Sequence, residues 1–429
     1  MDTAKVKEYI ADFQKSEFPP LTPRELRINA RTTVINTIIG PRRAGKTYYL
    51  YQLMQPIPRH EILYLNFEDI RLVSITFKDF LDIVNLHTEL TNTKPGYVFL
   101  DEPQVVGEWE KGVRTLLDQQ KFKIVITGSS SKLLSKELAT QLRGRTITHI
   151  LLPYSFSEFL EASGVHPKQP FSSEEKAKLR NYLERWLGWG GYPEVVKTES
   201  VTEKMKILES YRELIVYKDV VERYGIKTPF LAKLLTEHLI SNFSKEFSVN
   251  AFFNLLKSRN IRVSKKTLYA YLSLIEDSVA IFLVEKYSPK LKEQKLSPKK
   301  VYLCDTGLAY RQRHEKPKLM ENMVFLQLKR MQNLNPGLEI FYWKNHQHEV
   351  DFVLKEGQGI RKIIQVTYAD SREDVQKREL ASLLAATKEL KPRKLEVITW
   401  NYEGEEVYKG KGITFTPLWK WLLQTKHQH

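Results

Sequence analysis

The sequence predicts a multidomain α/β protein, and three observations support this prediction. A chain of 429 residues is long enough for two or three domains, at about 100 to 200 residues each. From about residue 33, short β-branched runs alternate with helical segments, which is typical of a parallel sheet with helices on both faces. After a mostly helical middle, a second α/β pattern begins near residue 320 and reads helix, strand, strand, helix, strand.

The composition is that of a folded globular chain with a basic excess. Apolar residues make up 42% and charged residues 28%, which excludes a disordered chain of one charge sign. Lys and Arg number 67 against 51 Asp and Glu, which gives a net charge of +16. This excess favours nucleic acid or an anionic surface as a partner, and the alternative is that solvated lysines only keep the protein soluble.

The cysteine content and the apolar runs predict a cytoplasmic protein without a membrane anchor. Cys304 is the single cysteine, which excludes an intrachain disulfide and a cysteine-based zinc cluster and favours a reducing compartment. No apolar run approaches the length of a membrane-spanning helix, and residues 1–20 lack the apolar core of a secretion signal. Residues 1–20 are instead expected to form an amphipathic helix that ends at Pro19 and Pro20.

The first domain is expected over residues 1–155, followed by a helical linker or lid over residues 156–228. A Gly- and Pro-rich corner at 188–193 interrupts the helical part. Strand candidates of the first domain are separated by segments long enough for crossover helices, and they lie at 33–39, 61–67, 97–101 and 123–127.

A phosphate-binding loop follows the first of these strands. The pattern Gly40-x-x-x-x-Gly45-Lys46-Thr47 stands between a strand and a helix, as this motif requires. Its backbone N–H groups can close around phosphates, while Lys46 supplies a charge to the β and γ phosphates and Thr47 offers a hydroxyl to Mg²⁺. The expected nucleotide-binding residues are Gly40, Pro41, Arg42, Arg43, Ala44, Gly45, Lys46, Thr47 and Tyr48.

Two carboxylates end the strand at 97–101, where open α/β sheets bind ligands. Asp101 is expected to hold the Mg²⁺ shell together with Thr47, and Glu102 to orient and deprotonate the attacking water. An Asp-Glu pair on its own is a weak signal, because charged residues often follow a strand that simply ends at the solvent-exposed surface. After a phosphate-binding loop, in this order, it becomes a strong one.

Hydroxyls and arginines after the next strand are further candidates. Thr127 or Ser129 could sense the γ-phosphate or hold the water, and the serines that follow could equally cap a helix. Arg143 and Arg145 could each reach a phosphate in their own subunit or in a neighbouring one, and a surface salt bridge is the alternative for both. The expected catalytic residues are therefore Lys46, Glu102, Ser129, Arg143 and Arg145.

These motifs resemble those of the AAA+-like P-loop ATPases that are widespread in prokaryotes and abundant in archaea. The resemblance is carried by the phosphate-binding loop and by Leu100-Asp-Glu-Pro-Gln104, Leu142-Arg-Gly-Arg145, Pro153-Tyr-Ser-Phe-Ser157, Trp189-Gly-Gly-Tyr-Pro193, Cys304-Asp-Thr-Gly307 and Glu349-Val-Asp-Phe352. It covers nearly the whole chain. It implies ATP binding and hydrolysis with Mg²⁺, a homo-oligomer such as a ring (a hexamer by analogy), a winged-helix middle and a C-terminal domain of unknown function.

Residues 229–315 are expected to form a winged helix-turn-helix. Helical patterns at 231–243, 249–260 and 264–277 precede a strand, a lysine-rich loop with six lysines between 286 and 300, and a second strand. The start of the third helix and the wing are the parts that contact DNA in such domains, and a packing or oligomerisation module is the alternative. The candidate nucleic-acid residues are Lys265, Lys266, Lys290, Lys292 and Lys295.

Residues 316–429 resemble the restriction-endonuclease-like PD-(D/E)XK fold. Glu321 lies on a predicted helix and Asp351 at a strand start, but Gln365 and Thr367 stand where an active enzyme would have Glu-x-Lys. Such an enzyme needs clustered carboxylates for Mg²⁺ and a lysine at the phosphate, and threonine cannot replace a cation. We therefore expect an inactive site whose surface is kept for nucleic acid or assembly, with Glu349 as an extra acid.

Three functions follow from these expectations. The first is an Mg²⁺-dependent ATPase that binds ATP and ADP and is coupled to binding or remodelling of nucleic acid, with DNA as the candidate partner. The second is a slow NTPase switch or scaffold that recruits a protein partner. The third, an ATP-dependent nuclease, is weakened by Gln365 and Thr367.

Overall fold

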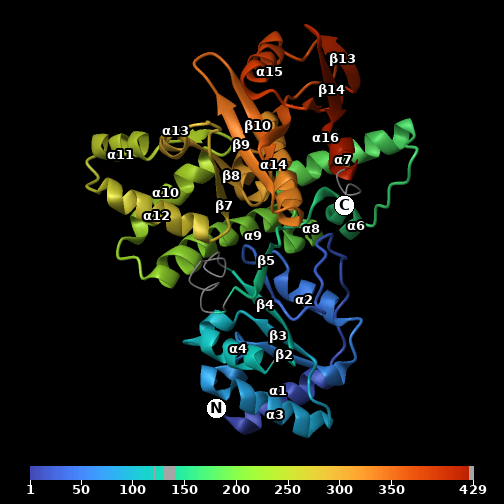
Figure 1. The fold of residues 1–429 in the computed structure, drawn as a ribbon, viewed down its shortest axis with the longest axis vertical. Coiled ribbons are helices and arrows are strands. Elements are labelled where there is room, and N and C mark those ends of the chain that lie inside the picture. The colour runs from blue at the N-terminus through green and yellow to red at the C-terminus, as the bar shows by residue number, and fades with distance from the viewer. Residues whose placement is uncertain (120, 130–141, 143, 425–429) are drawn as a thin grey trace. The chain divides into compact units, whose positions relative to one another are not determined.

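The computed structural model describes residues 1–119, 121–129, 142 and 144–424 (Figure 1). The chain divides into two compact units. The N-terminal unit comprises Met1–Leu152 with Asp277–Val279, and the C-terminal unit comprises Pro153–Glu276 and Ala280–His429. Within the described ranges, no helix is both long enough and apolar enough to cross a membrane.

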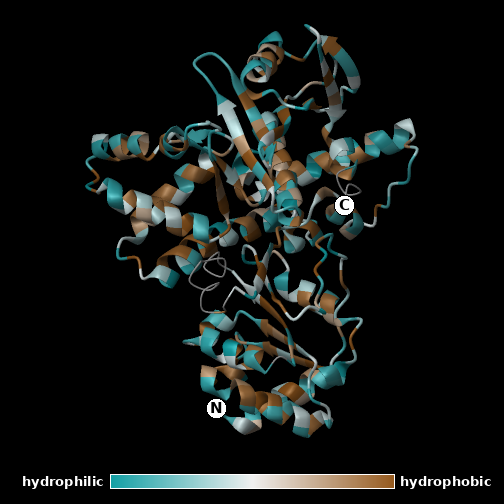
Figure 2. Cartoon of the chain, viewed as in Figure 1, coloured by the Kyte–Doolittle hydropathy of each residue, from teal (hydrophilic) through white to brown (hydrophobic). Residues whose placement is uncertain are grey.

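The N-terminal unit is built on a five-stranded parallel sheet. Its strands are β1 (Ile35–Ile39), β2 (Ile62–Asn66), β3 (Tyr97–Asp101), β4 (Lys123–Gly128) and β5 (Thr146–Ile150). They lie in the order β2-β3-β4-β1-β5, so β4 separates the strand before the phosphate-binding loop from the strand that ends in Asp101. The inner strands are buried, and their residues are mostly apolar, as the brown colouring in Figure 2 shows.

Helices cover this sheet as the alternating pattern predicted. They are α1 (Thr3–Lys15), α2 (Lys46–Met54), α3 (Phe80–Thr91) and α4 (Trp109–Asp118). The predicted amphipathic N-terminal helix is α1, which starts where the Asp2 side chain accepts a hydrogen bond from the Lys5 N–H, and which buries Val6, Tyr9 and Ile10.

The C-terminal unit begins with a helical segment. It contains α6 (Phe156–Ala162), α7 (Ser173–Trp189), α8 (Pro193–Lys197), α9 (Val201–Leu214) and a π-helix, η6 (Ile215–Glu222). Capping boxes at Ser155 and Ser172 fix the first two helix starts. Helix α7 ends at Gly190, where the Gly- and Pro-rich corner was predicted.

A buried carboxylate ties this corner to a distant part of the chain. Asp305 accepts hydrogen bonds from the N–H groups of Gly191 (2.7 Å) and Gly307 (2.8 Å). Burial raises the pKa of Asp305 to about 7, although these two hydrogen bonds act against the rise. A Cβ on Gly190 would lie 1.7 Å from Asp305 Oδ1, so only glycine fits there.

The middle of the C-terminal unit consists of three helices and a small antiparallel sheet. The elements are α10 (Pro229–Ser241), β6 (Glu246–Phe247), α11 (Val249–Ser258), α12 (Lys265–Asp277), β7 (Ile281–Val284), α13 (Leu291–Leu296) and β8 (Lys299–Leu303). The sheet order is β6-β8-β7. The three helices agree with the prediction, but the expected lysine-rich loop is wrong in part, because its centre is the short helix α13.

A six-stranded sheet follows the 3₁₀ segment η7 (Thr306–Gln312). Its order is β13-β14-β12-β11-β10-β9, and its elements are α14 (Lys316–Leu334), β9 (Leu338–Lys344), β10 (Glu349–Glu356), β11 (Gly359–Val366), α15 (Lys377–Leu390), β12 (Lys394–Thr399), β13 (Gly404–Tyr408), β14 (Lys411–Pro417) and α16 (Leu418–Gln424). The predicted strand count is too low. The prediction missed the third strand of the meander and the β13–β14 hairpin. Turns of only two residues, at 357–358 and 409–410, join these strands, so each pair resembles a single strand in the sequence.

Candidate active site

The phosphate-binding loop connects β1 to α2, as the motif predicted. The Lys46 side chain is buried, and its Nζ donates hydrogen bonds to the carbonyl oxygens of Gly40 (3.1 Å) and Pro41 (3.3 Å). A Cβ on Gly40 would lie 2.1 Å from the carbonyl oxygen of Leu151, so the close approach of these two segments requires glycine.

A buried arginine outside the motif supports the same loop. Arg24 donates from Nη1 to the carbonyl oxygen of Ala44 (2.9 Å) and from Nη2 to that of Leu152 (2.5 Å). No sequence pattern indicates this role, because Arg24 lies before the first strand in a segment without periodicity. Its two bonds hold the loop against the chain that leaves β5.

Asp101 and Thr47 meet at the end of β3. The Thr47 hydroxyl donates to Asp101 Oδ2 at 2.7 Å, and the Tyr64 hydroxyl reaches the same oxygen at 3.2 Å. The Thr127 hydroxyl donates to the other carboxylate oxygen. Burial raises the pKa of Asp101, and the hydrogen bonds from Thr127 and Thr47 oppose that rise.

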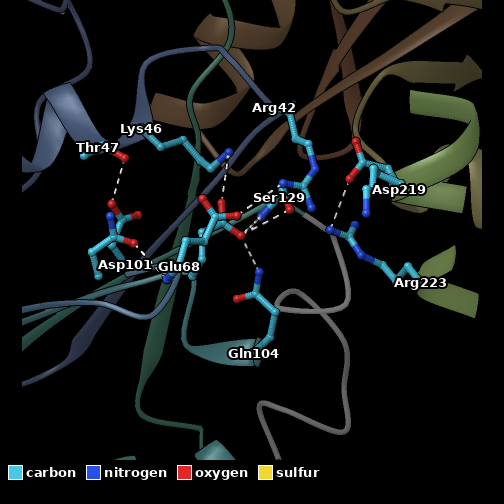
Figure 3. Close-up of polar contacts among 12 residues, drawn as sticks. Arg42, Lys46, Thr47, Glu68, Asp101, Gln104, Ser129, Asp219 and Arg223 are labelled. Carbon is cyan, nitrogen blue, oxygen red and sulfur yellow. Dashed lines mark hydrogen bonds and ion pairs between the residues drawn. The ribbon is translucent and has the colours of Figure 1, made fainter. Parts of the chain in front are cut away.

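Glu102 occupies the left-handed region, with φ 53° and ψ 45°. Its N–H donates to the Thr127 hydroxyl at 3.2 Å, and its carboxylate lies 3.4 Å from Lys46 Nζ. Ser129 donates to Glu102 Oε2 from its N–H and its hydroxyl, each at 3.2 Å, and Gln104 donates to the same oxygen (Figure 3). A non-glycine residue in this conformation is strained, and such strain gathers at functional sites.

The protonation state of Glu102 follows from these contacts. Burial would raise its pKa, but the positive charge of Lys46 and the hydrogen bond from Gln104 outweigh burial and lower the pKa below its ordinary value. Glu102 is therefore an ionised carboxylate at neutral pH. Gln104 was not among the predicted residues, although its position two residues after Glu102 in the motif could have suggested it.

The donor set fits a nucleotide with a magnesium ion. The Thr47 hydroxyl and the Asp101 carboxylate, 2.7 Å apart, are the hard oxygen ligands that Mg²⁺ prefers. The buried ammonium of Lys46 stands beside the loop whose N–H groups would meet the phosphates. The chemistry that these groups support is phosphoryl transfer to water.

The remaining predicted loop residues lie around this centre. Arg42 Nη1 is 3.4 Å from Glu68 Oε1, and the positive charge of Arg42 also lowers the pKa of Glu102. Arg43 has a positive φ of 63°, and Tyr48 on α2 is 50% exposed.

One of the two predicted arginines, Arg145, lies away from this site. Arg143 lies outside the described residues. The carbonyl oxygen of Arg145 accepts a hydrogen bond from the Ile35 N–H, at the beginning of β1. The phosphate-binding loop follows the other end of β1, five residues away and about 16 Å along the strand. The expected role of Arg145 in the site of its own subunit is therefore wrong, while a role in a neighbouring subunit and a surface salt bridge stay open as its alternatives.

The predicted nucleic-acid residues lie on exposed surface of the C-terminal unit. Lys265 and Lys266 are exposed at the start of α12, while Lys290, Lys292 and Lys295 are exposed on or beside α13. Lys295 is not available as a wing cation in this arrangement, because its Nζ lies 2.8 Å from Glu285.

Of the four residues of the nuclease-like pattern, Asp351, Gln365 and Thr367 are buried at one end of β10 and β11, and Glu321 on α14 is half-buried. Glu321 on α14 and Asp351 on β10 both lie 3.0 Å from the Nζ atom of Lys300. Lys300 was expected in the lysine-rich wing, and no cation was expected in this cluster. The structure contradicts both expectations, since Lys300 is buried within the cluster.

Sequence profiles divide the chain into three matched regions. The AAA domain profile matches residues 32–160. Two profiles of domains of unknown function, DUF8612 and DUF4143, match residues 180–318 and 316–421.

Solved structures resemble the chain only weakly. Those matched include AMPPCP-bound DnaA from Aquifex aeolicus, at 13% identity and a TM-score of 0.24 over 72% of this chain and 92% of that one. A DNA replication initiation factor matches at 13% identity and a TM-score of 0.25 over 64% and 91%. TM-scores this low do not establish a common fold.

Two whole-length relatives are much more similar in sequence. An uncharacterized protein of Haemophilus influenzae is 32% identical over 343 residues, which are 77% of this chain and 81% of that protein. The uncharacterized protein MJ1544 of Methanocaldococcus jannaschii is 38% identical over 411 residues, which are 93% of this chain and 90% of that protein. The chain therefore belongs to the family of MJ1544, and its N-terminal part is a P-loop nucleotide-binding domain of the AAA type.

Proposed function

We propose that the protein is an Mg²⁺-dependent ATPase whose nucleotide state controls the binding of nucleic acid. The observation that carries the first half is the convergence of two motifs that are about 55 residues apart: Thr47 bonds to Asp101, and Lys46 pairs with Glu102. Each pair joins a residue of the phosphate-binding loop to one at the end of β3. These four side chains are therefore in contact without any rearrangement of the backbone.

Each residue has a defined role in this proposal. The loop from Gly40 to Thr47 binds the phosphates, and Thr47 and Asp101 would hold the Mg²⁺, which supplies charge neutralisation at the phosphates. Glu102 accepts the proton of the attacking water, and Ser129 with Gln104 keeps its carboxylate oriented through hydrogen bonds.

The second half of the proposal rests on the charge of the middle segment. Residues 247–275 contain no Asp or Glu. Five cations are exposed around the turn between α11 and α12, and no ion pair joins them to a carboxylate within the described residues: Lys257, Arg259, Arg262, Lys265 and Lys266. Three helices with a sheet ordered β6-β8-β7 suit a winged helix, in which this turn and the start of α12 would contact phosphates.

We assign the chain four parts on this basis: an ATPase domain at 1–155, a helical lid at 156–228, a winged helix at 229–315 and a nuclease-like domain at 316–429. The order α14, three meander strands, α15 and a strand parallel to β11 supports the last assignment. The expected subunit arrangement is a homo-oligomer in which Arg145 acts on a neighbour's nucleotide.

The slow protein-recruiting switch remains the second candidate because of one observation. Three of the six lysines between 286 and 300 are paired with acids of the same segment: Lys286 lies 3.1 Å from Glu293, and Lys295 and Lys299 lie 2.8 and 3.5 Å from Glu285. A neutralised wing would contribute little to phosphate binding.

Steady-state ATP hydrolysis with Mg²⁺, alone and with single-stranded, duplex or branched DNA, tests the proposal. An increase of about tenfold or more in the hydrolysis rate, which corresponds to an activation free energy lower by about 1.4 kcal/mol, supports an ATPase coupled to nucleic acid. The double variant Lys265→Ala/Lys266→Ala should lose the stimulation and reduce the salt dependence of DNA binding, while Lys355→Ala, which removes a single lysine of β10, serves as the control. Slow hydrolysis that no nucleic acid changes would favour the switch.

A further inference from the structure

A second polar cluster lies in the C-terminal unit, and a buried lysine is at its centre. Lys300 on β8 is only 2% exposed. Its Nζ lies 3.0 Å from Glu321 Oε1, 2.8 Å from Glu349 Oε1 and 3.0 Å from Asp351 Oδ1. One ammonium group therefore joins β8, α14 and β10, and it takes its partners from two different segments of the chain.

Each carboxylate of this cluster also has a second donor. The Tyr302 hydroxyl donates to Glu321 at 2.6 Å, and the backbone N–H of residue 366 donates to Asp351 Oδ2 at 2.9 Å. Lys344 Nζ lies 3.2 Å from Glu349 Oε2. These donors orient the three carboxylates toward the position that the Lys300 ammonium occupies.

The cluster carries more negative than positive charge. Burial raises the pKa of Glu321 to about 7, with a further rise from the charge of Asp351, while Lys300 acts against it. The surrounding carboxylates raise the pKa of Lys300 well above its ordinary value in spite of its burial, so the ammonium stays charged. Electrostatics therefore hold a cation among these oxygens.

Strand β11 and helix α15 contribute two further side-chain oxygen atoms that accept no hydrogen bond from the residues that the structure describes. Phe352 pairs with Ile364, so Gln365 lies opposite Asp351 and projects to the same face of the sheet. Within the described part of the chain, Gln365 Oε1 and Glu379 Oε2 are buried and have no hydrogen-bond partner. Carboxylate and amide oxygens are the ligands that hard divalent cations prefer.

We propose that the Lys300 ammonium is the resident cation of this oxygen cluster, in the place that a divalent metal ion would take among the same carboxylates. A metal ion bound by Glu321, Glu349 and Asp351 would have to displace an ammonium that contacts all three within 3.0 Å. The cluster then fastens β8 to the large sheet, and removal of Lys300 converts it into a site for Mg²⁺ or Mn²⁺. This inference is independent of the ATPase proposal.

Binding of Mn²⁺ to the full-length, nucleotide-free chain tests the proposal, with free Mn²⁺ counted by electron paramagnetic resonance. In the wild-type background, Glu321→Gln should leave the number of bound Mn²⁺ ions unchanged. Lys300→Ala should bind one additional Mn²⁺, the double variant Lys300→Ala/Glu321→Gln should lose it, and Mn²⁺ should raise the unfolding temperature of Lys300→Ala alone. Lys355→Ala, which breaks the surface pair with Glu339 at 2.6 Å, is the matched control and should behave as wild type.

Two results would overturn the proposal. The first is a wild-type chain that binds Mn²⁺ and loses one ion on Glu321→Gln, because the cluster would then hold a metal ion with Lys300 in place. The second is a folded Lys300→Ala variant that gains no Mn²⁺. If Lys300→Ala does not fold, the comparison of wild type with Glu321→Gln decides by itself.

Discussion

Glu102 Oε1 lies 3.4 Å from Lys46 Nζ, and both side chains are buried beneath the phosphate-binding loop. The proposed base is thus ion paired with the cation of the other motif. A bound triphosphate would give Lys46 a second anionic partner, and the carboxylate of Glu102 would then compete with phosphate for the same ammonium. A substitution of Glu102 should therefore affect ATP binding and ATP hydrolysis differently.

Glu102→Gln should lower kcat at least about 100-fold, because an amide cannot accept a proton from water. ATP affinity should stay the same or rise, since Lys46 loses its competing carboxylate. Steady-state kinetics and equilibrium binding of ATP measure the two effects. The control is Glu89→Gln, which removes a surface partner of Lys7 at 2.7 Å and should change neither quantity. A Glu102→Gln variant with more than about a tenth of wild-type kcat would show that another group is the base.

Arg145→Ala should lower kcat about 100-fold or more with ATP affinity unchanged, if the arginine completes a neighbour's site. Because Arg145 lies next to the start of β5 and away from the loop of its own subunit, complementation between two variants is the most informative measurement. An equimolar mixture with Glu102→Gln should recover about a quarter of wild-type activity, because a random quarter of interfaces would pair an intact Glu102 with an intact Arg145. A mixture no more active than its components would exclude Arg145 as a group acting between subunits.

Gly190→Ala should destabilise the fold by about 3 kcal/mol or more, through a steric clash in addition to backbone strain. Its φ is 77°, and the new Cβ would lie 1.7 Å from Asp305 Oδ1. Gly357→Ala is the matched control, since Gly357 has a φ of 61° but open space around it. Gly357→Ala should lower the free energy of unfolding only by the backbone strain, about 1 to 2 kcal/mol. Chemical denaturation of both variants measures the difference, and equal losses would contradict the clash.

The candidate nucleotide site could be predicted from sequence because its residues lie in short contiguous motifs. Gly40 to Thr47 and Asp101-Glu102 each follow a strand, and parallel strands bring their carboxyl ends to one edge of a sheet. Arg145 was misplaced for the opposite reason. Its residue type suggested a phosphate partner, but only the register of β5 against β1 shows that it lies beside the beginning of β1, at the end opposite to the phosphate-binding loop.

The Lys300 cluster could not be predicted, because nothing local distinguishes this lysine from its neighbours. It stands in a run with Lys299, and strand alternation turns one of the two to the solvent side and the other into the cluster. Its partners Glu321 and Asp351 are 21 and 51 residues away. The phase of β8, and hence the burial of Lys300, depends on pairing with β6 and β7.

Asp305 makes stability depend on pH in a defined direction. Its pKa in the fold is about 7, raised from 3.8 chiefly by burial. The folded chain therefore binds more protons than the unfolded chain between these values, and stability falls as pH rises through that window. Above about pH 7 both states are ionised, so the loss from this group is complete.

The variant Asp305→Asn isolates this contribution. It cannot ionise, so its unfolding free energy should fall less steeply than that of wild type between about pH 5 and pH 7, by up to about 1.4 kcal/mol per pH unit. Urea denaturation at several pH values gives the two curves. Glu321, whose pKa is also raised to about 7, titrates in both chains and cancels in the comparison. Parallel curves would mean that Asp305 keeps an ordinary pKa, and the two hydrogen bonds from Gly191 and Gly307 would then outweigh the cost of burying its charge.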